Sequence, residues 1–410
     1  MTDDPVRAQY EAYPYPERNP ADEKARLIVG SPSHPMEIDH FLFGGARDWA
    51  RPFRVLVAGG GTGDALVMLA QILADHGVAP DILYLDQSAA SRRIAEARVT
   101  ARGLTGIRFE TGDLLDAADY GSFDYIDCCG VLHHLPDPDA GFRALRSALA
   151  EGGGMGGMVY APHGRAGVYE MQDALAVLVG GDTPEVQVAH TRRLLGSLPP
   201  TNGLKRNPFL TDHAQGGEAG LYDLLLHARD RPYTVNALFD ALDGAGLEFM
   251  SFAAPGRYDP RLLIADPVLR KRATALPYRA QAALAERLVG NIKTHVFYAA
   301  PRKSGQSVAV PAPDAVPCLI GVSGEALAAS VRKSGRVRGN VEGVAFESAV
   351  PHEAAAILAA MDGVRSLHEI RRHLRWPRQK FDGFFGKLYE PLNDFGLLRF
   401  SLLKRAAFRP

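Results

Sequence analysis

The fold of this chain is decided by the stretch Arg54-Val-Leu-Val-Ala-Gly-Gly-Gly-Thr-Gly-Asp64, in which an apolar run breaks into a glycine-rich turn. Residues 55–57 form a continuous apolar run, which is typical of a parallel strand buried on both faces. Residues 65–74 have the apolar spacing of a helix. Between them, glycine allows a tight turn and close approach of the backbone to a ligand. The pattern predicts a nucleotide-type site at a helix N-terminus. The glycines are Gly59, Gly60, Gly61 and Gly63.

The composition is that of an ordinary globular protein. A length of 410 residues predicts two to three domains. The net charge of −1 argues against a general attraction to nucleic acid or to an anionic membrane. We find no apolar run of about 18 residues, and the acidic N-terminus does not resemble a signal peptide. Three cysteines without metal-type spacing favour a reduced, cytoplasmic setting.

Strand and helix patterns alternate after residue 51, which predicts an α/β fold with a largely parallel sheet covered on both faces. Further strands are expected at 81–86, 107–110, 123–127, 152–160, 247–253 and 294–300. Helices are expected at 6–13, 89–101, 139–149, 169–179, 186–195, 235–245, 259–289, 352–361, 366–374 and 379–394. A loop is expected between 199 and 217, and short strands at 319–322 and 397–400.

Six regions are predicted from these patterns. The prolines of the fifth region are typical of a linker, and two helices around a Gly-bearing turn in the last region suggest a winged-helix-like arrangement. The regions are an N-terminal helical cap (1–50), a Rossmann-like core (51–163), a helical insertion (164–245), the final strands and helices of the core (246–300), a linker (301–317) and a C-terminal module (318–410).

The glycine turn by itself does not identify the ligand. A dinucleotide fingerprint requires a third glycine at position 64, where this chain has Asp64. Asp86 ends the second strand, where a carboxylate can accept two hydrogen bonds from a ribose diol. Asp113 follows the third strand and has two readings of equal weight. It accepts a bond from an exocyclic amine such as adenine N6, or it caps a helix or turn.

The stretch Val131-Leu-His-His-Leu-Pro-Asp-Pro138 completes an ordered set with the glycine turn, Asp86 and Gly112-Asp113. In this order the motifs resemble class I S-adenosylmethionine-dependent methyltransferases, over about residues 51–165 and the final strands. The resemblance implies S-adenosylmethionine as the cofactor. It also implies that the glycine turn approaches the methionine part. The other implied cofactor residues are Asp86 for the ribose, Gln87 next to it, Asp113 and Leu114 for the adenine, and Cys129 or its neighbour Cys128 near the sulfonium.

The first strand departs from this family in one position. The family usually has an acid two residues before the first glycine, and this chain has Val57 there. The resemblance therefore implies that another residue binds the methionine amino group. A looser similarity, at 9–16, 164–169 and 222–233, is to bacterial methyltransferases with a regulatory-type helical region, some distant members of which modify protein side chains.

The candidate catalytic residues are His133, His134 and Tyr160. Open parallel sheets bind ligands at the carboxyl ends of their strands, where these residues are expected. A neutral histidine there can accept a proton near neutral pH. The alternative is that the histidines only hold the loop backbone, and no metal site is predicted. His163, Tyr169, His213, His227 and Tyr233 are weaker candidates.

The sequence thus predicts a cytoplasmic methyltransferase (EC 2.1.1.-) acting on a protein side chain or a small molecule. The run Arg371-Arg-His-Leu-Arg-Trp-Pro-Arg-Gln-Lys380 invites a nucleic-acid interpretation. Docking of a protein partner is preferred for this module, and no membrane partner is expected. Two other functions stay open. One is an NAD(P)-dependent oxidoreductase, which Asp64 disfavours, and the other is a non-catalytic, S-adenosylmethionine-binding regulatory protein.

Overall fold

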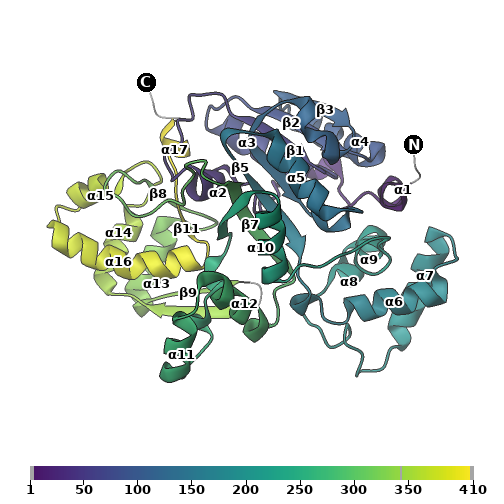
Figure 1. The fold of residues 1–410 in the computed structure, drawn as a ribbon. Helices are drawn as coiled ribbons and strands as arrows, with labels where there is room; N and C mark the ends of the chain where they lie inside the picture. The colour runs from purple at the N-terminus through teal and green to yellow at the C-terminus, as the bar shows by residue number, and fades with distance from the viewer. Residues whose placement is uncertain (1–3, 342–343, 407–410) are drawn as a thin grey trace.

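A seven-stranded sheet lies at the centre of the computed structural model, which describes residues 4–341 and 344–406 (Figure 1). The strand order is β3-β2-β1-β4-β5-β7-β6. Pairing is parallel from β3 to β5, while β7 runs antiparallel to both of its neighbours. The mostly parallel, Rossmann-like sheet predicted from the sequence is confirmed. The strands are β1 (Arg54–Ala58), β2 (Asp81–Asp86), β3 (Ile107–Thr111), β4 (Phe123–Cys129), β5 (Leu149–Tyr160), β6 (Leu247–Phe252) and β7 (Thr294–Pro301).

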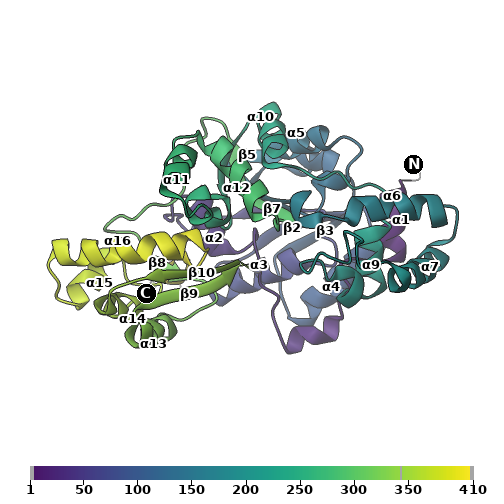
Figure 2. The same ribbon diagram turned by 90° about the horizontal axis from the view of Figure 1, so that it is seen from below.

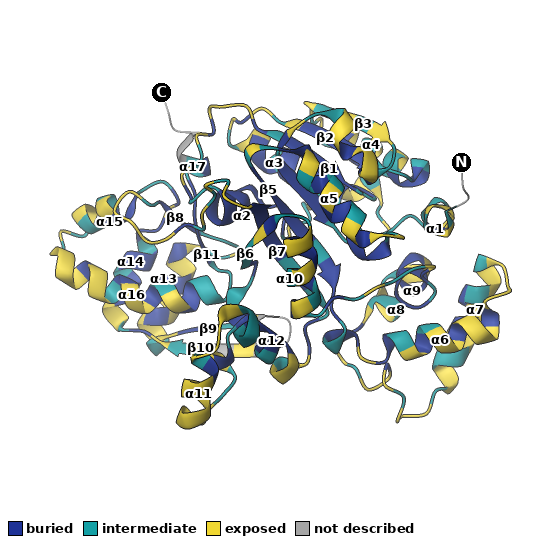
Figure 3. Cartoon of the chain, in the orientation of Figure 1, coloured by how far each residue is buried: buried dark blue, intermediate teal, exposed yellow. Residues whose placement is uncertain are grey.

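Alternate residues of β1 point into two different cores. Val55 and Val57 pack with α2 (Pro35–Leu42), α3 (Asp64–Asp75) and α4 (Ala89–Ala101). Leu56 and Ala58 pack with the helices of the opposite face, α5 (Pro138–Ala148), α10 (Val235–Gly244) and α12 (Tyr278–Val289). The sheet is therefore buried on both faces, as Figure 3 shows by its dark strands.

The helix expected over 259–289 is divided. It consists of a 3-10 turn (Pro260–Leu262), α11 (Pro267–Thr274) and α12, and another 3-10 turn (Pro255–Tyr258) precedes it. Pro267 occupies the first turn of α11 and Pro277 is the N-cap of α12. Because proline has no N–H and clashes with a preceding helical turn, it begins a helix here rather than continuing one.

The N-terminal region contains α1 (Pro5–Ala12), as predicted, a 3-10 turn (Pro20–Lys24), and α2, which was not predicted. All eight residues of α2 are buried, including three with ionisable side chains, so the helix shows no amphipathic period. Glycines in β5 allow this region to approach the sheet. A Cβ at Gly154 would lie 2.8 Å from the Leu42 side chain, and one at Gly156 would lie 2.7 Å from Pro32.

The helical insertion lies to one side of the sheet, away from the C-terminal module (Figures 1 and 2). It has its own apolar core. Two expectations need correction. The segment 199–217, expected as a loop, contains the whole of one short helix (Asp212–Gln215) and the first residue of the next. The helix α10, grouped with the insertion, packs on the sheet. The insertion helices are α6 (Val168–Val179), α7 (Pro184–Ser197), α8 (Asp212–Gln215) and α9 (Gly217–Leu225).

The C-terminal module contains the three expected helices and, in addition, two unpredicted helices and an unpredicted hairpin. The strand expected at 319–322 lies at Pro317–Leu319 and pairs antiparallel with β11. The winged-helix-like arrangement and the region boundaries stay predictions, and residues 1–3, 342–343 and 407–410 of those regions lie outside the described residues. The elements are β8 (Pro317–Leu319), α13 (Gly324–Ser334), β9 (Arg336–Val341), β10 (Val344–Ala349), a 3-10 turn (His352–Ala354), α14 (Ala355–Ala359), α15 (Leu367–His373), α16 (Arg378–Asp394), β11 (Leu398–Phe400) and α17 (Leu403–Ala406).

Buried polar contacts join this module to α2. The Arg399 guanidinium is fully buried, 3.3 Å from Glu37 Oε1, and donates to the Ala253 carbonyl oxygen at 2.6 Å. Asp39 accepts from the Ser401 hydroxyl at 2.8 Å. The segment predicted as a linker also lies against α2, since the Ala309 N–H donates to the His40 carbonyl oxygen at 2.7 Å. No helix of the described ranges has the length and apolarity that crossing a membrane requires.

Candidate active site

The turn after β1 requires its glycines. Gly59, Gly61 and Gly63 have positive φ angles of 70°, 52° and 96°, which side chains disfavour. A Cβ at Gly60 would lie 2.3 Å from the Tyr84 ring. The Tyr84 hydroxyl donates to the Gly61 carbonyl oxygen at 2.6 Å and holds the turn over β2.

Asp86 ends β2 and is half-buried beside this turn. Its Oδ2 accepts from the Gly61 N–H and its Oδ1 from the Ser88 N–H, both at 2.8 Å. Burial raises the pKa of this carboxyl, which the backbone donors partly offset. Each oxygen keeps a lone pair that can accept a hydroxyl, so Asp86 suits the ribose diol of an adenosyl group. Gln87, the next residue, is also half-buried.

Three further predicted cofactor residues follow neighbouring strands at the same edge of the sheet. Asp113 Oδ1 accepts from the Leu115 N–H at 2.9 Å and caps the 3-10 helix Leu114–Tyr120, which is the capping role considered for it above. Leu114 is buried. Cys129 is half-buried at the end of β4, where burial raises the pKa of its thiol and keeps it neutral.

Residues 10–18, which we call the N-terminal strap, cross the same edge. The Ser88 hydroxyl donates to the Tyr10 carbonyl oxygen at 3.1 Å, and the Thr62 hydroxyl donates to that of Pro16 at 2.7 Å. The Glu11 carboxylate accepts from the backbone of Ala89 and Ala90 at the start of α4. The sequence predicted the helix but not this contact, because nothing in a local pattern shows where a terminal segment docks.

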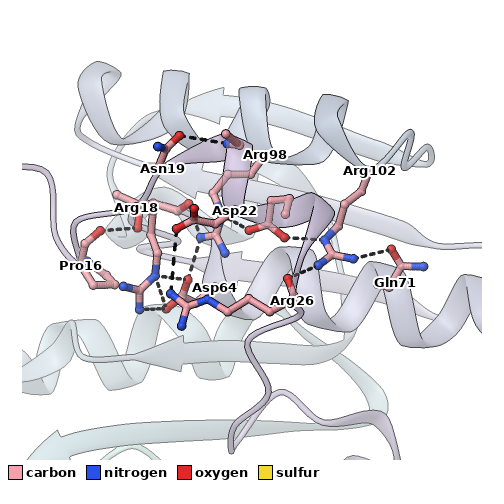
Figure 4. Close-up of polar contacts among 12 residues, drawn as sticks. Pro16, Arg18, Asn19, Asp22, Arg26, Asp64, Gln71, Arg98 and Arg102 are labelled. Carbon is pink, nitrogen blue, oxygen red and sulfur yellow. Dashed lines mark hydrogen bonds and ion pairs between the residues drawn. The ribbon is translucent and has the colours of Figure 1, made fainter.

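An ion-pair network anchors the residues that follow the strap (Figure 4). Asp64 begins α3 and lies 2.6 Å from both the Arg18 and the Arg98 guanidinium groups. Arg98, almost fully buried, also pairs with Glu23 at 2.6 Å. Although burial raises the pKa of Asp64, the bonds from both arginines outweigh it and hold that pKa below its usual range. The residue that breaks the dinucleotide spacing thus holds the N-terminal segment in place.

The predicted catalytic residues come together in a buried polar cluster. His133 and His134 lie on the 3-10 helix Leu132–His134 after β4, and Tyr160 ends β5. The His133 ring centroid lies 4.0 Å from that of Tyr160. The Tyr160 hydroxyl donates to Asp223 Oδ2 at 2.9 Å, and the Tyr10 hydroxyl of the strap donates to Oδ1 at 3.0 Å.

Burial keeps the cluster's histidines neutral. His134 Nδ1 lies 2.7 Å from the Arg229 carbonyl oxygen and must donate to it, so Nε2 carries a lone pair. That Nε2 has no hydrogen-bond partner in the described part of the chain, and neither does either ring nitrogen of His133. Burial lowers the pKa of His134 to about 3 and that of His133 well below its usual value. Burial raises the pKa of Asp223 to about 6.

His134, Asp223 and His227 are close enough to suggest a metal site, since one atom of each lies within 4.8 Å of the others. The hydrogen bonds argue against it. The Arg229 N–H donates to His227 Nδ1 at 3.0 Å, so His227 Nε2 carries the proton and donates to the Tyr10 oxygen at 3.1 Å. A protonated nitrogen is not a metal ligand.

Sequence reasoning missed three members of this cluster, Arg165, Asp230 and Asp223, whereas Tyr169 was among its weaker candidates. Arg165 stacks on the Tyr160 ring at 3.7 Å and pairs with Asp230 at 2.9 Å. Asp223 comes from α9, far along the chain, and carries no motif. Tyr169 accepts a hydrogen bond from Arg165 at 3.1 Å and supports it.

Comparison with known proteins agrees with the geometry. Residues 56–155 match the family described as "Methyltransferase domain". An uncharacterized protein of Synechococcus is 34% identical over 277 residues, which span 66% of this chain and 65% of that protein. The chain thus aligns with less than two thirds of that relative's length.

Two solved structures cover most of the chain. They are PKMT2 from Rickettsia typhi (TM-score 0.63) and the same protein in complex with AdoHcy (TM-score 0.64). Each is 14% identical and covers 90% of this chain and 75% of the other, a likeness of fold. Sheet order, glycine turn and family match lead to one conclusion. This chain contains a methyltransferase domain of the class I, S-adenosylmethionine-dependent type.

Proposed function

We propose that the protein transfers a methyl group from S-adenosylmethionine to a protein side chain or a small-molecule acceptor held against the His133–His134–Tyr160 cluster. The observation that carries this proposal is the strap. The backbone carbonyl oxygen of Tyr10 accepts a hydrogen bond from the Ser88 hydroxyl, close to Asp86 in the sequence. The Tyr10 hydroxyl donates a hydrogen bond to Asp223 in the cluster. The cofactor edge and the buried cluster are therefore two parts of one site.

The cofactor residues have separate tasks in this proposal. Asp86 and Gln87 hold the ribose, and Asp113 and Leu114 border the adenine. The turn Gly59–Gly63 approaches the methionine part, and Cys129 lies near the sulfur. S-adenosylmethionine supplies a methyl group on a positively charged sulfur, so positioning of the acceptor supplies much of the rate.

The cluster orients the acceptor. His134 Nε2 accepts a hydrogen bond from an N–H or O–H of the acceptor, because its lone pair is buried and unused. With a pKa of about 3, His134 is a weak base. Asp223, with a pKa of about 6, is the stronger one, and a proton reaches it through the Tyr160 hydroxyl, which already donates to it.

The C-terminal module is proposed to be winged-helix-like and to dock a protein partner. Its basic run is partly used within the module, since Lys380 lies 4.3 Å over the Trp376 ring. This internal use favours a protein over a nucleic acid as the partner.

Two measurements test the proposed activity. Calorimetry with S-adenosylhomocysteine and with NAD(P) separates the methyltransferase from the oxidoreductase, for which only the second ligand would bind. A labelled-methyl transfer assay on cell extract, divided into protein and small-molecule fractions, then identifies the acceptor class. Tight S-adenosylhomocysteine binding without any labelled product would instead support the non-catalytic alternative.

A further inference from the structure

Asp127 lies beside the position where the expected acid is absent. In the pairing of β1 with β4, Asp127 is the partner of Val57. Paired residues of neighbouring strands point to the same face of a sheet. Val57 is two residues from the glycine turn, and Asp127 is two residues from Cys129 at the end of β4. The carboxyl group therefore belongs to the edge where the glycine turn and β4 end together.

The surroundings of Asp127 do not stabilise a negative charge on its carboxyl group. The side chain is 2% exposed, and its Oδ2 accepts from the Ser33 hydroxyl. Among the residues that the structure describes, no lysine, arginine or histidine forms an ion pair with it. Burial raises its pKa to about 7, against a smaller opposing effect of Ser33. A buried carboxylate without a cation is costly and is normally paired.

A cationic ligand would remove this mismatch. The methionine part of S-adenosylmethionine carries an α-ammonium group, and the proposed function already directs that part to the glycine turn. Two other acids lie at this turn. Asp64 is occupied by Arg18 and Arg98, and Asp86 accepts from the backbone N–H groups of Gly61 and Ser88. Asp127 thus has the charge that the ammonium group needs, and Val57 does not.

We propose that Asp127 binds the α-ammonium group of the cofactor, with Ser33 orienting the carboxylate. The acid that the family places at the end of β1 has moved to the adjacent position on β4. This inference rests on the proposed function, because it assumes that S-adenosylmethionine is the ligand.

Two ligands that differ in the ammonium group test the assignment. S-adenosylhomocysteine contains the amino-acid part, whereas 5′-methylthioadenosine lacks it and keeps the adenosine and sulfur. Asp127→Asn should weaken S-adenosylhomocysteine binding roughly 10-fold to 100-fold. Binding of 5′-methylthioadenosine should stay within about twofold of the wild type, measured by calorimetry at one pH above 7. Equal weakening of both ligands, or no change in either, would overturn the assignment.

Two further variants make the test independent of folding defects. Glu286→Gln removes a different buried carboxyl, from α12, and should leave the affinity ratio of the two ligands unchanged. The double variant Val57→Asp with Asp127→Leu returns the acid to β1 and should regain S-adenosylhomocysteine affinity over Asp127→Leu alone. If the wild type, Asp127→Asn and Asp127→Leu bind S-adenosylhomocysteine equally well, the proposed function stands and only the role of Asp127 falls.

Discussion

Arg18 Nη2 lies 2.6 Å from Asp64 Oδ2, which ties the end of the N-terminal strap to the first residue of α3. The strap covers the glycine turn so closely that a Cβ at Gly61 would lie 3.0 Å from the Tyr15 carbonyl oxygen. Entry and exit of a cofactor at this turn therefore require the strap to move, and the Arg18–Asp64 pair opposes that movement.

Arg18→Ala should raise the dissociation rate of S-adenosylhomocysteine. The pair is partly exposed, with about a quarter of each side chain accessible, so an effect of roughly two- to tenfold is expected. Stopped-flow displacement measures the rate. Arg26→Ala is the control, because Arg26 contacts Asp22 at 4.0 Å on the exposed surface of the same region. Equal dissociation rates of S-adenosylhomocysteine from the two variants would show that the Arg18–Asp64 pair does not hold the strap over the glycine turn.

Asp86→Ala should weaken S-adenosylhomocysteine binding by about 1–3 kcal/mol, because the ribose hydroxyls lose their acceptor. The same change frees the Gly61 N–H, so Asp86→Asn, which keeps one carbonyl oxygen, should have a smaller effect. Calorimetry measures both. Asp81→Ala, at the exposed start of β2, is the matched control, and unchanged affinity in Asp86→Ala would refute the ribose assignment.

His134→Asn should lower kcat about 100-fold while leaving S-adenosylhomocysteine affinity unchanged. The asparagine amide can replace Nδ1 as donor to the Arg229 carbonyl oxygen, but it has nothing in place of Nε2. The test is single-turnover methyl transfer once an acceptor is known. A kcat near that of the wild type would show that His134 only holds the backbone of its loop.

The stability of the ligand-free protein should respond to pH through Asp127. Its pKa is about 7 when folded and near 3.8 when unfolded, so the folded state holds the extra proton between these values. The contribution of this group to stability is therefore full below about pH 3.8, falls as the pH rises from there to 7, and is lost above 7. Its titratable neighbours Tyr125, Cys128 and Cys129 stay neutral there, because burial raises the pKa of each.

Asp127→Asn should remove this dependence and raise the melting temperature of the ligand-free protein at pH 8.5 relative to the wild type. This difference should shrink as the pH falls from 7 towards 4, and near pH 4 the two proteins should melt alike. Scanning calorimetry at both pH values checks the difference. A variant that is less stable than the wild type at pH 8.5 would contradict an unpaired buried carboxylate.

Arg399→Met should destabilise the protein by roughly 3–5 kcal/mol, because it leaves Glu37 buried without its cation. Arg399 also donates to the Ala253 carbonyl oxygen, so the loss affects β11, α2 and the end of β6 together. Thermal melting and limited proteolysis of the C-terminal module measure the effect. The double variant of Arg399→Met with Glu37→Gln should recover part of the lost stability. If the two changes instead lower the free energy of unfolding additively, Arg399 and Glu37 do not stabilise one another.

The sequence by itself determined the local elements and the cofactor edge of this protein. The run 55–57 and the glycine turn lie within one strand–turn unit, and Asp86 lies at the end of the next strand. Their arrangement follows from the chirality and period of parallel strands. The positive φ angles of Gly59, Gly61 and Gly63 are local too, and glycine spacing reveals them directly.

Only the tertiary structure decided what covers that edge and what completes the buried cluster. Tyr10, Asp223 and Tyr160 meet from α1, α9 and β5, and the contacts between such distant segments leave no periodic signal. The same holds for α2, whose buried polar side chains Glu37, Asp39 and His40 have partners from the far end of the chain in Arg399, Ser401 and the Phe400 N–H. The pairing of Asp127 with Val57 is likewise a matter of strand register, which neither residue shows alone.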